Sequence, residues 1–159
     1  MKEILLAASL FLAPAAPAHN VKVYFVAPPP NDGIPAKVVP VSRKAPDSGV
    51  AKFALQQLIL GPTKAERRKG LTSDLGRRIR GRSDCGADFQ LKIKKGVAKV
   101  RFCRTVWGTG VGGDATVLHQ IETTLRQFPS VRKVISLDKD GRCLFEQTNS
   151  GRVCLGGRE

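Results

Sequence analysis

The sequence predicts an α/β (α+β) fold in which two main helices lie on one face of an open mixed β-sheet. Apolar residues recur at three- and four-residue steps between positions 113 and 128, which is the period of a helix buried on one side. Segments 89–94 and 97–102 alternate apolar and polar side chains, as half-buried strands do. Segment 131–137 is rich in β-branched and apolar residues and predicts a strand directly after the helix. The expected order of elements is β-α-β-β-α-β.

The helix over 113–128 is the element on which the others are expected to pack. Asp114 is expected to cap its start, because a carboxylate can accept hydrogen bonds from the free amides of a first helical turn. The polar residues of this segment are mostly assigned to faces away from the core: Gln120, Glu122, Thr123, Arg126 and Gln127. Pro129 disfavours helical geometry at the residue before it, so the helix is expected to end near residue 128. The apolar face is formed by Val117, Leu118, Ile121, Leu125 and Phe128.

The remaining strands are predicted from alternation and from turn residues. A first strand is expected at 21–26 and a short second one at 37–43, where Pro40 confines the strand to an edge or a bulge. Segments 89–94 and 97–102 are expected to form a hairpin around the two-residue loop Lys95-Gly96. This loop places six apolar residues on one face by pairing Ile93 with Ala98, Leu91 with Val100, and Phe89 with Phe102.

Two helices are predicted in the first half of the chain. The first is expected to begin at a cap formed by Asp47 or Ser48 and to end near Leu60, before a Gly-Pro pair. Thr63 and Glu66 then have the spacing of a capping box, in which each side chain satisfies a free amide at the start of a brief second helix.

Residues 1–18 are predicted to be a signal peptide. A short positive start precedes an apolar core at 4–12 and the small-residue cleavage site Ala16-Pro17-Ala18. The apolar run is too short to span a bilayer as an anchor, and a buried N-terminal strand or helix is the alternative. We therefore expect one exported domain at 19–141 and a disulfide-tied hairpin or tail at 142–159. The expected location is periplasmic, extracellular or on the cell surface, with no membrane anchor evident.

Four cysteines, an even number, are expected to be oxidised in an exported protein. We favour the pairs Cys85–Cys103 and Cys143–Cys154, because each pair brackets a predicted hairpin. Each link should stabilise the fold by roughly 3 kcal/mol, less any strain. Zinc binding is the alternative, but the chain has no CxxC pair, and His119 lies in the predicted helix rather than beside a thiol.

Charge provides the main hypothesis about binding. The formal net charge is +14, which favours anionic partners such as acidic envelope polymers or lipid headgroups and opposes non-specific self-association. The segment from 71 to 83 shows no periodicity and is basic. Trp107, beside the glycine-rich loop, is a candidate contact residue, but a cover over the core is the favoured role. The side chains predicted to contact an anion or partner are Lys64, Arg67, Arg68, Lys69, Arg77, Arg78, Arg80, Arg82 and Trp107. The alternative for the basic run is a solvated surface.

No catalytic site, metal, cofactor or small-molecule substrate is expected. A nucleophilic triad needs a histidine, and the sequence has only His19, at the expected mature N-terminus, and His119. The acids are scattered at predicted turns and caps, which are their usual structural positions. The glycines between 108 and 113 lack the lysine of a phosphate-binding loop. Few large amphipathic aromatics are present, so nucleic acid is a disfavoured partner.

Several segments of the chain have a recognisable order and spacing. They are Val23-Tyr24-Phe25, Leu58-Ile59-Leu60-Gly61-Pro62-Thr63, Gly70-Leu71-Thr72, Gly96-Val97-Ala98-Lys99-Val100, and Ile121-Glu122-Thr123-Thr124-Leu125-Arg126-Gln127-Phe128-Pro129-Ser130-Val131. Through these segments the chain resembles, over about 21–137, the GerMN domain, which is named for sporulation and spore germination proteins.

The resemblance implies an extracytoplasmic, non-catalytic domain that is similar to the ring-building motifs of secretion-like assemblies. The cysteines and tail look like a disulfide-bearing branch of the family found outside spore formers. Many members carry two such domains or a lipoprotein anchor. This chain is expected to have a single domain and no lipoprotein anchor. The predicted function is a cell-envelope module for protein–protein interaction or ring-like self-association. The alternative is a cationic binder of anionic polymers or lipid headgroups through residues 64–82.

Overall fold

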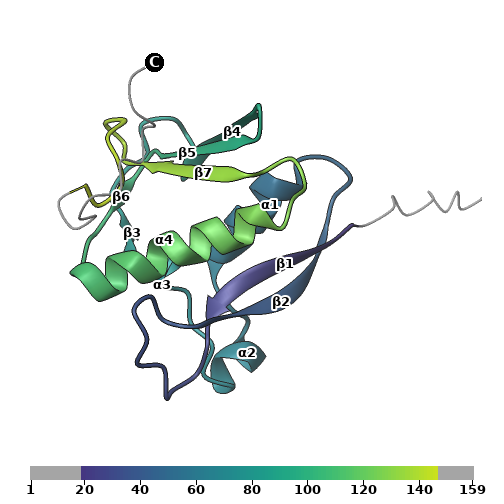
Figure 1. Cartoon of the computed structure of the whole chain (residues 1–159), viewed down its shortest axis with the longest axis vertical. Helices are drawn as coiled ribbons and strands as arrows, with labels where there is room; N and C mark the ends of the chain where they lie inside the picture. Colours follow the sequence, from purple (N-terminus) through teal and green to yellow (C-terminus); the bar gives the residue numbers. More distant parts are fainter. Residues whose placement is uncertain (1–18, 147–159) are drawn as a thin grey trace, which may run out of the picture.

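The computed structural model describes residues 19–146 of the 159-residue chain and has a mixed α+β fold, which confirms the predicted class (Figure 1). The signal peptide at 1–18 and most of the tail lie outside the described residues and stay predictions. The elements are β1 (His19–Val26), β2 (Val38–Ala45), α1 (Val50–Leu60), α2 (Lys64–Arg68), α3 (Asp74–Arg78), β3 (Ile79–Arg80), β4 (Phe89–Lys94), β5 (Val97–Phe102), β6 (Thr105–Val106), α4 (Val111–Arg126) and β7 (Lys133–Leu137).

The described strands are divided among three sheets, where the sequence suggests one. β1 and β2 form an antiparallel pair, β3 and β6 form a second, and β4, β5 and β7 form a three-stranded sheet in which β5 and β7 run parallel. Helix α4 lies between the two larger sheets, and α1 packs against both α4 and β1 (Figure 1). The main core therefore forms around α4, as its apolar stripe predicts. Its fully buried members include Phe25, Leu55, Leu58, Phe102, Ile121 and Leu125.

One edge of β1 is occupied by side chains of α4 and of Gln127 just after it, and no other strand of residues 19–146 pairs with this edge. Gln127 accepts from the backbone N–H of Lys22 at 2.8 Å and donates to its carbonyl at 2.6 Å. Two residues along the strand, Thr124 accepts from the Tyr24 amide at 3.3 Å and Gln120 donates to the Tyr24 carbonyl at 3.0 Å. These polar side chains replace a neighbouring strand, since buried backbone groups need hydrogen-bond partners.

The assignment of Gln120 to an outer face of α4 is therefore wrong, because its side chain is fully buried. Its carbonyl oxygen also accepts from the backbone N–H of Asp74 at 3.0 Å, so one amide joins β1, α3 and α4. Helical periodicity assigns polar residues to the solvent-exposed faces of a helix. It cannot identify a polar residue that is buried because it hydrogen-bonds to a strand edge.

The hairpin of β4 and β5 has the predicted register. Phe89 pairs with Phe102, Leu91 with Val100 and Ile93 with Ala98. The edge position of β2 is also confirmed, because Pro40 pairs with Tyr24 in a strand whose only partner among the described residues is β1.

Two predicted helix caps are wrong. Gly49 precedes α1 in a left-handed conformation, and neither Asp47 nor Ser48 caps the helix. Helix α4 begins at Val111 after Gly110, so Asp114 lies inside its first turn, where its carboxylate turns inward. The capping box is confirmed, because the side chains of Thr63 and Glu66 each accept from the other residue's backbone amide at the start of α2.

Residues 71–83 contain the short helix α3 and strand β3, whereas the sequence indicates no periodic structure there. A five-residue helix and a two-residue strand are too short to show a period. Gly76 is required in α3, because a Cβ at this position would collide with the carbonyl of Ile59. Ser73 holds the start of α3 against α1, because its hydroxyl donates to the Leu58 carbonyl at 2.6 Å and accepts from the Gly76 amide at 3.2 Å.

The predicted disulfide between Cys85 and Cys103 is present. It joins the segment between β3 and β4 to the residue that follows β5. Cys143 is also disulfide-bonded, and its predicted partner, Cys154, lies outside the described residues. Within residues 19–146, no helix combines the length and apolar character needed to cross a membrane.

Candidate functional site

The basic run from 64 to 82 follows α2, α3 and β3, and the fold uses part of its charge internally. Helix α2 begins at the capping box of Glu66, whose carboxylate also binds both guanidinium nitrogens of Arg43, at 2.9 and 2.6 Å. The hydrogen bond from Arg43 lowers the pKa of Glu66 against the opposing effect of burial, and the Thr63 backbone amide lowers it further. The only acid on α2 is therefore neutralised by a strand arginine and leaves the helix cations uncompensated.

Arg78 is among the predicted anion or partner contacts, but its guanidinium is nearly buried in an internal ion network. It lies 3.1 Å from the carboxylate of Asp74 and 3.2 Å from that of Asp114, with 11% of its side chain exposed. Asp114 also accepts from the Thr109 amide at 2.9 Å. Gly113 leaves room for this network, because a Cβ there would collide with the Arg78 guanidinium. Arg78 thus joins α3 to the start of α4.

The other basic side chains of the run point outward. Arg77 pairs with Asp74 at 2.5 Å yet remains two-thirds exposed. The side chain of Arg67 donates to the Pro62 carbonyl. Five more are exposed and form no ion pair with any acid in the described part of the chain: Lys64, Arg68, Lys69, Arg80 and Arg82.

Pairing of β3 with β6 brings Trp107 to the basic run, although the two are far apart in sequence. Ile79 pairs with Val106, and the Trp107 amide donates to the Arg78 carbonyl at 3.1 Å. The Trp107 residue is 62% exposed, so it is not a cover over the core. The structure therefore leaves this indole available for contact beside the arginine-bearing strand.

A groove of about 310 Å³ lies where the end of α1 meets α2 and α3. Its apolar lining includes Ile59, Leu60 and Leu71, and its charged lining consists of Arg67 and Arg77. Leu60 is 74% exposed, although it belongs to a helix whose other leucines are fully buried. Sequence reasoning missed this groove. The available signal was an apolar residue at the last helical position, just outside the buried stripe and before Gly61.

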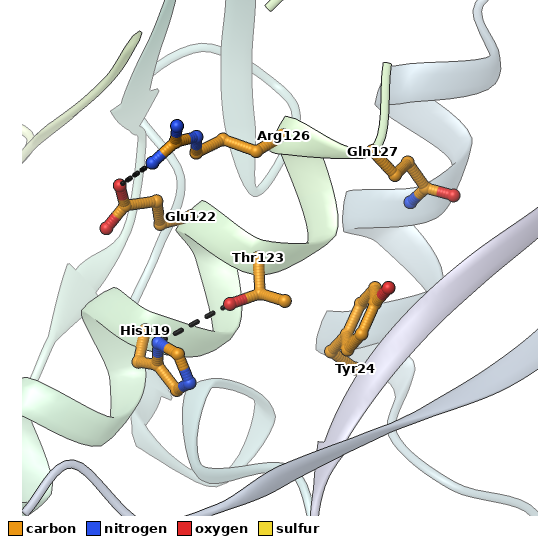
Figure 2. A pocket seen from close by; sticks show the side chains of 6 residues that line it. All are labelled: Tyr24, His119, Glu122, Thr123, Arg126 and Gln127. Carbon is orange, nitrogen blue, oxygen red and sulfur yellow. Dashed lines mark hydrogen bonds and ion pairs between the residues drawn. The ribbon is translucent and has the colours of Figure 1, made fainter. Parts of the chain in front are cut away.

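A second hollow, of about 450 Å³, lies between α4 and β1 and includes the histidine of α4 (Figure 2). The ring of His119 is 3.4 Å from the Thr123 hydroxyl, and Glu122 forms an ion pair with Arg126 at 3.2 Å. A catalytic triad needs an acid that orients the histidine, whereas this glutamate is paired with the arginine instead. The hollow is a polar surface depression in which nucleophile, base and orienting acid are not assembled.

One group of potential metal ligands occurs within the described residues, formed by Asp84, Cys85 and Cys103. The two sulfur atoms are joined as a disulfide. Zinc binds cysteine as the thiolate, so this group does not fit the alternative of a zinc site.

Taken together, the geometry defines a class: an α+β domain built around one long helix, with a surface rich in arginine and lysine. The chain belongs to the Germane (GerMN) family, described as sporulation and spore germination, whose model matches residues 22–141. The expected resemblance is thereby confirmed. No curated protein matches the sequence.

Solved structures that are similar to this chain include two of GerMN domains. The tandem GerMN domains of the sporulation protein GerM from Bacillus subtilis share 22% identity at a TM-score of 0.55, covering 81% of this chain and 44% of that one. This chain therefore spans less than half the length of that tandem structure. The first GerMN domain of the same protein shares 18% identity at a TM-score of 0.49, covering 79% of this chain and 86% of that one. The tandem-domain match supports the fold.

Proposed function

We propose that this GerMN-family domain is a non-catalytic, exported module of the cell envelope that binds a protein partner through the groove between α1 and α2–α3. The observation that carries the proposal is Leu60, an apolar side chain that is 74% exposed at a groove also lined by Ile59 and Leu71. Exposed apolar surface rimmed by polar groups is typical of protein interaction sites.

The charge around the groove indicates what kind of partner fits. Arg67 and Arg77 line it, and Lys64 and Arg68 extend the positive surface along α2. A partner segment that inserts an apolar side chain over Leu60 and carries carboxylates on both sides would meet complementary charge. A second copy of this chain fits less well, because two molecules with a net charge of +14 repel each other.

Export is supported by the disulfide between Cys85 and Cys103, because disulfides persist mainly in oxidising compartments. The expected signal peptide at 1–18 agrees with this. The non-catalytic assignment is supported by the hollow of Figure 2, where Glu122 pairs with Arg126 and does not orient His119. Both assignments belong to the proposal.

Site-specific crosslinking tests the proposal. A photoreactive amino acid replaces Leu60 in one variant and Ile34 in a matched control, since Ile34 is similarly exposed, at 70%, and does not line the groove. We expect position 60 to crosslink one envelope protein, through a peptide with acidic residues around an apolar one, and Leu60→Asp to abolish capture while Ile34→Asp retains it. Equal capture at both positions, or capture of no protein, would contradict the proposal. Crosslinking to a second copy, with dimers in light scattering, would replace it with self-association.

A second candidate function is binding of anionic envelope polymers or lipid headgroups through residues 64–82. The observation in its favour is the set of five exposed cations in this run that have no acidic partner among residues 19–146. Binding of this kind weakens steeply as salt rises. The substitutions Arg77→Ala, Arg80→Ala and Arg82→Ala should then weaken polymer binding. An affinity that changes neither with salt nor with these substitutions would contradict this second candidate function.

A further inference from the structure

A second concentration of positive charge lies at the turn end of the three-stranded sheet, away from residues 64–82 in sequence. It consists of six exposed side chains, which we call the cationic sheet face: Lys92, Lys94, Lys95, Lys99, Arg132 and Lys133. The two β4 lysines alternate with Leu91 and Ile93 of the core side, and Lys99 lies between the fully buried Ala98 and Val100. The strand lysines therefore point away from the core.

The strand register brings these charges close together. Lys92 lies directly opposite Lys99 in the antiparallel pair, which places their Cβ atoms about 5 Å apart. Lys94 pairs with Val97, which pairs in turn with Lys133 of β7, so these three residues form one row across the sheet. Two like charges directly opposite each other destabilise a sheet, so the arrangement opposes folding unless a ligand neutralises it.

The turn between β4 and β5 contains Lys95, whose backbone conformation does not favour folding. Lys95 has φ 50° and Gly96 has φ 82°, the left-handed pair that asparagine and glycine usually occupy in two-residue hairpins. A lysine has no short polar group to offset this conformation. Arg132 lies against the turn, where its guanidinium donates to the Lys95 carbonyl at 3.2 Å and closely approaches Gly96.

The described acids near this sheet are placed elsewhere. Asp84 pairs with Arg101 and Asp88 with Arg104 at the opposite end of the hairpin, and the acids at 138 and 140 pair with Lys139 and Arg142. Within residues 19–146, no ion pair involves a member of the cationic sheet face.

We propose that the cationic sheet face binds a linear polymer of repeating phosphate groups. Lys92 and Lys94 are about 7 Å apart along β4, and the cross-strand lysines extend the charge over the neighbouring strands, so several anionic groups of one polymer are met at once. Lysine suits phosphate as a mobile point charge. This second surface is independent of the groove at Leu60 and differs from the 64–82 segment.

Two other polyanionic partners fit this face less well. No aromatic residue belongs to it, so bases have no side chain on which to stack. Insertion between lipid chains needs exposed apolar groups. Among the described large apolar residues that are more than a third exposed, only Ile93 belongs to this hairpin, and it lies on the opposite face.

The test compares two variants of the mature chain that lose the same charge at different places. The sheet variant carries Lys92→Gln, Lys94→Gln, Lys99→Gln and Lys133→Gln. The segment variant carries Lys64→Gln, Arg68→Gln, Lys69→Gln and Arg82→Gln, all exposed and unpaired with described acids. Binding of fluorescently labelled inorganic polyphosphate is measured by anisotropy over a range of salt concentrations, and thermal unfolding verifies that each variant is folded.

We expect the sheet variant to bind polyphosphate on the order of tenfold more weakly or worse, with the slope of its salt dependence reduced by about 0.7 for each phosphate group that is no longer bound. The segment variant should retain affinity within about twofold. Equal weakening of both variants would show diffuse attraction by net charge, and weakening confined to the segment variant would favour the second candidate function; both results contradict the proposal. Tighter binding of polyglutamate, an oligonucleotide or anionic phospholipid vesicles than of polyphosphate would also overturn it.

Discussion

Between residues 64 and 82 the fold ties Arg78 to two carboxylates, whereas at the turn end of the three-stranded sheet none of six cations has an acidic partner among residues 19–146. The first region has the denser run of basic residues in the sequence. In three dimensions its central arginine is nearly buried and serves the packing of α3 on α4. The second region is assembled from two segments and exposes every charge.

The difference teaches that a count of basic residues along a chain does not show which of them are free to bind a ligand, because Arg78 is held in internal ion pairs. What decides is where the acids are placed. Asp74 and Asp114 converge on the 64–82 region from two helices, while Asp84 and Asp88 bind arginines at the far end of the hairpin. The comparison therefore predicts that substitution of Arg78 affects folding most, and that substitutions in the cationic sheet face affect binding most.

The largest expected effect is that of Arg78→Ala. Removing one partner of a buried ion pair typically costs about 3–5 kcal/mol, and Arg78 is an ion partner of Asp114, which is only 2% exposed. The free energy of unfolding, from denaturant titration, should fall by this amount. Arg80→Ala is the control, because this exposed arginine forms no ion pair with a described acid, and it should change stability by less than about 0.5 kcal/mol. If both substitutions lowered the free energy of unfolding by similar amounts, the distinction between the ion-paired Arg78 and the unpaired Arg80 would be wrong.

Gln120→Leu extends the comparison to a neutral buried group. The substitution leaves the Tyr24 carbonyl and the Asp74 amide without their side-chain partner, and each unsatisfied buried group costs about 1–3 kcal/mol. Because both hydrogen bonds are only partly buried, denaturant titration should show a total destabilisation of about 1–3 kcal/mol. The control is Gln56→Leu on the exposed side of α1, which removes no hydrogen bond described for the fold. An unchanged stability for Gln120→Leu would mean that α4 does not seal the edge of β1 through this side chain.

Lys92→Glu should act in the opposite direction and stabilise the fold. A glutamate facing Lys99 exchanges cross-strand repulsion for attraction, worth about 0.2–1 kcal/mol. Thermal unfolding should show a higher midpoint for this variant, while Lys22→Glu, which faces Ser42 on β2, should show little change. Polyphosphate affinity should fall for Lys92→Glu at the same time. A lower midpoint would indicate that the two lysines do not repel each other in the folded protein.

The smallest expected effect is the pH dependence contributed by Glu66. Its pKa is lowered from the ordinary value of 4.5, mainly by the hydrogen bond from Arg43, so the folded state holds this carboxylate ionised more strongly than the unfolded state does. The stabilisation is complete above the unfolded pKa and is lost as pH falls through the folded value. Glu66→Gln should flatten the acid limb of the stability curve below about pH 4.5. A curve of unchanged slope would show that this pair contributes nothing to acid stability.

Much of the fold was predictable, because it depends on local and periodic signals. The register of β4 and β5 follows from alternation and a two-residue loop, and the start of α2 follows from Thr63 and Glu66. The separation of the β1–β2 pair from the other strands was not predictable. The β1 edge is occupied by Gln120, Thr124 and Gln127, and periodicity alone assigns such polar residues to solvent.

The candidate sites were predictable only in part, for two physical reasons. The buried role of Arg78 depends on Asp114, 36 residues later in the chain, and such a pairing leaves no local pattern. The cationic sheet face combines lysines of the hairpin with Arg132 and Lys133 through the parallel pairing of β5 and β7. Alternation correctly predicts a solvated face for the hairpin lysines, but nothing local indicates that β7 adds further cations to it.

Lysine footprinting tests most directly whether the free charges of the sheet, rather than those of the basic run, bind polyphosphate. Amine acylation of the mature protein, with and without inorganic polyphosphate, is measured residue by residue by mass spectrometry. We predict protection of Lys92, Lys94, Lys99 and Lys133, with Lys64 and Lys69 reacting at the same rate in both samples. Protection of Lys64 and Lys69 alone, or equal protection of all six lysines, would contradict the account.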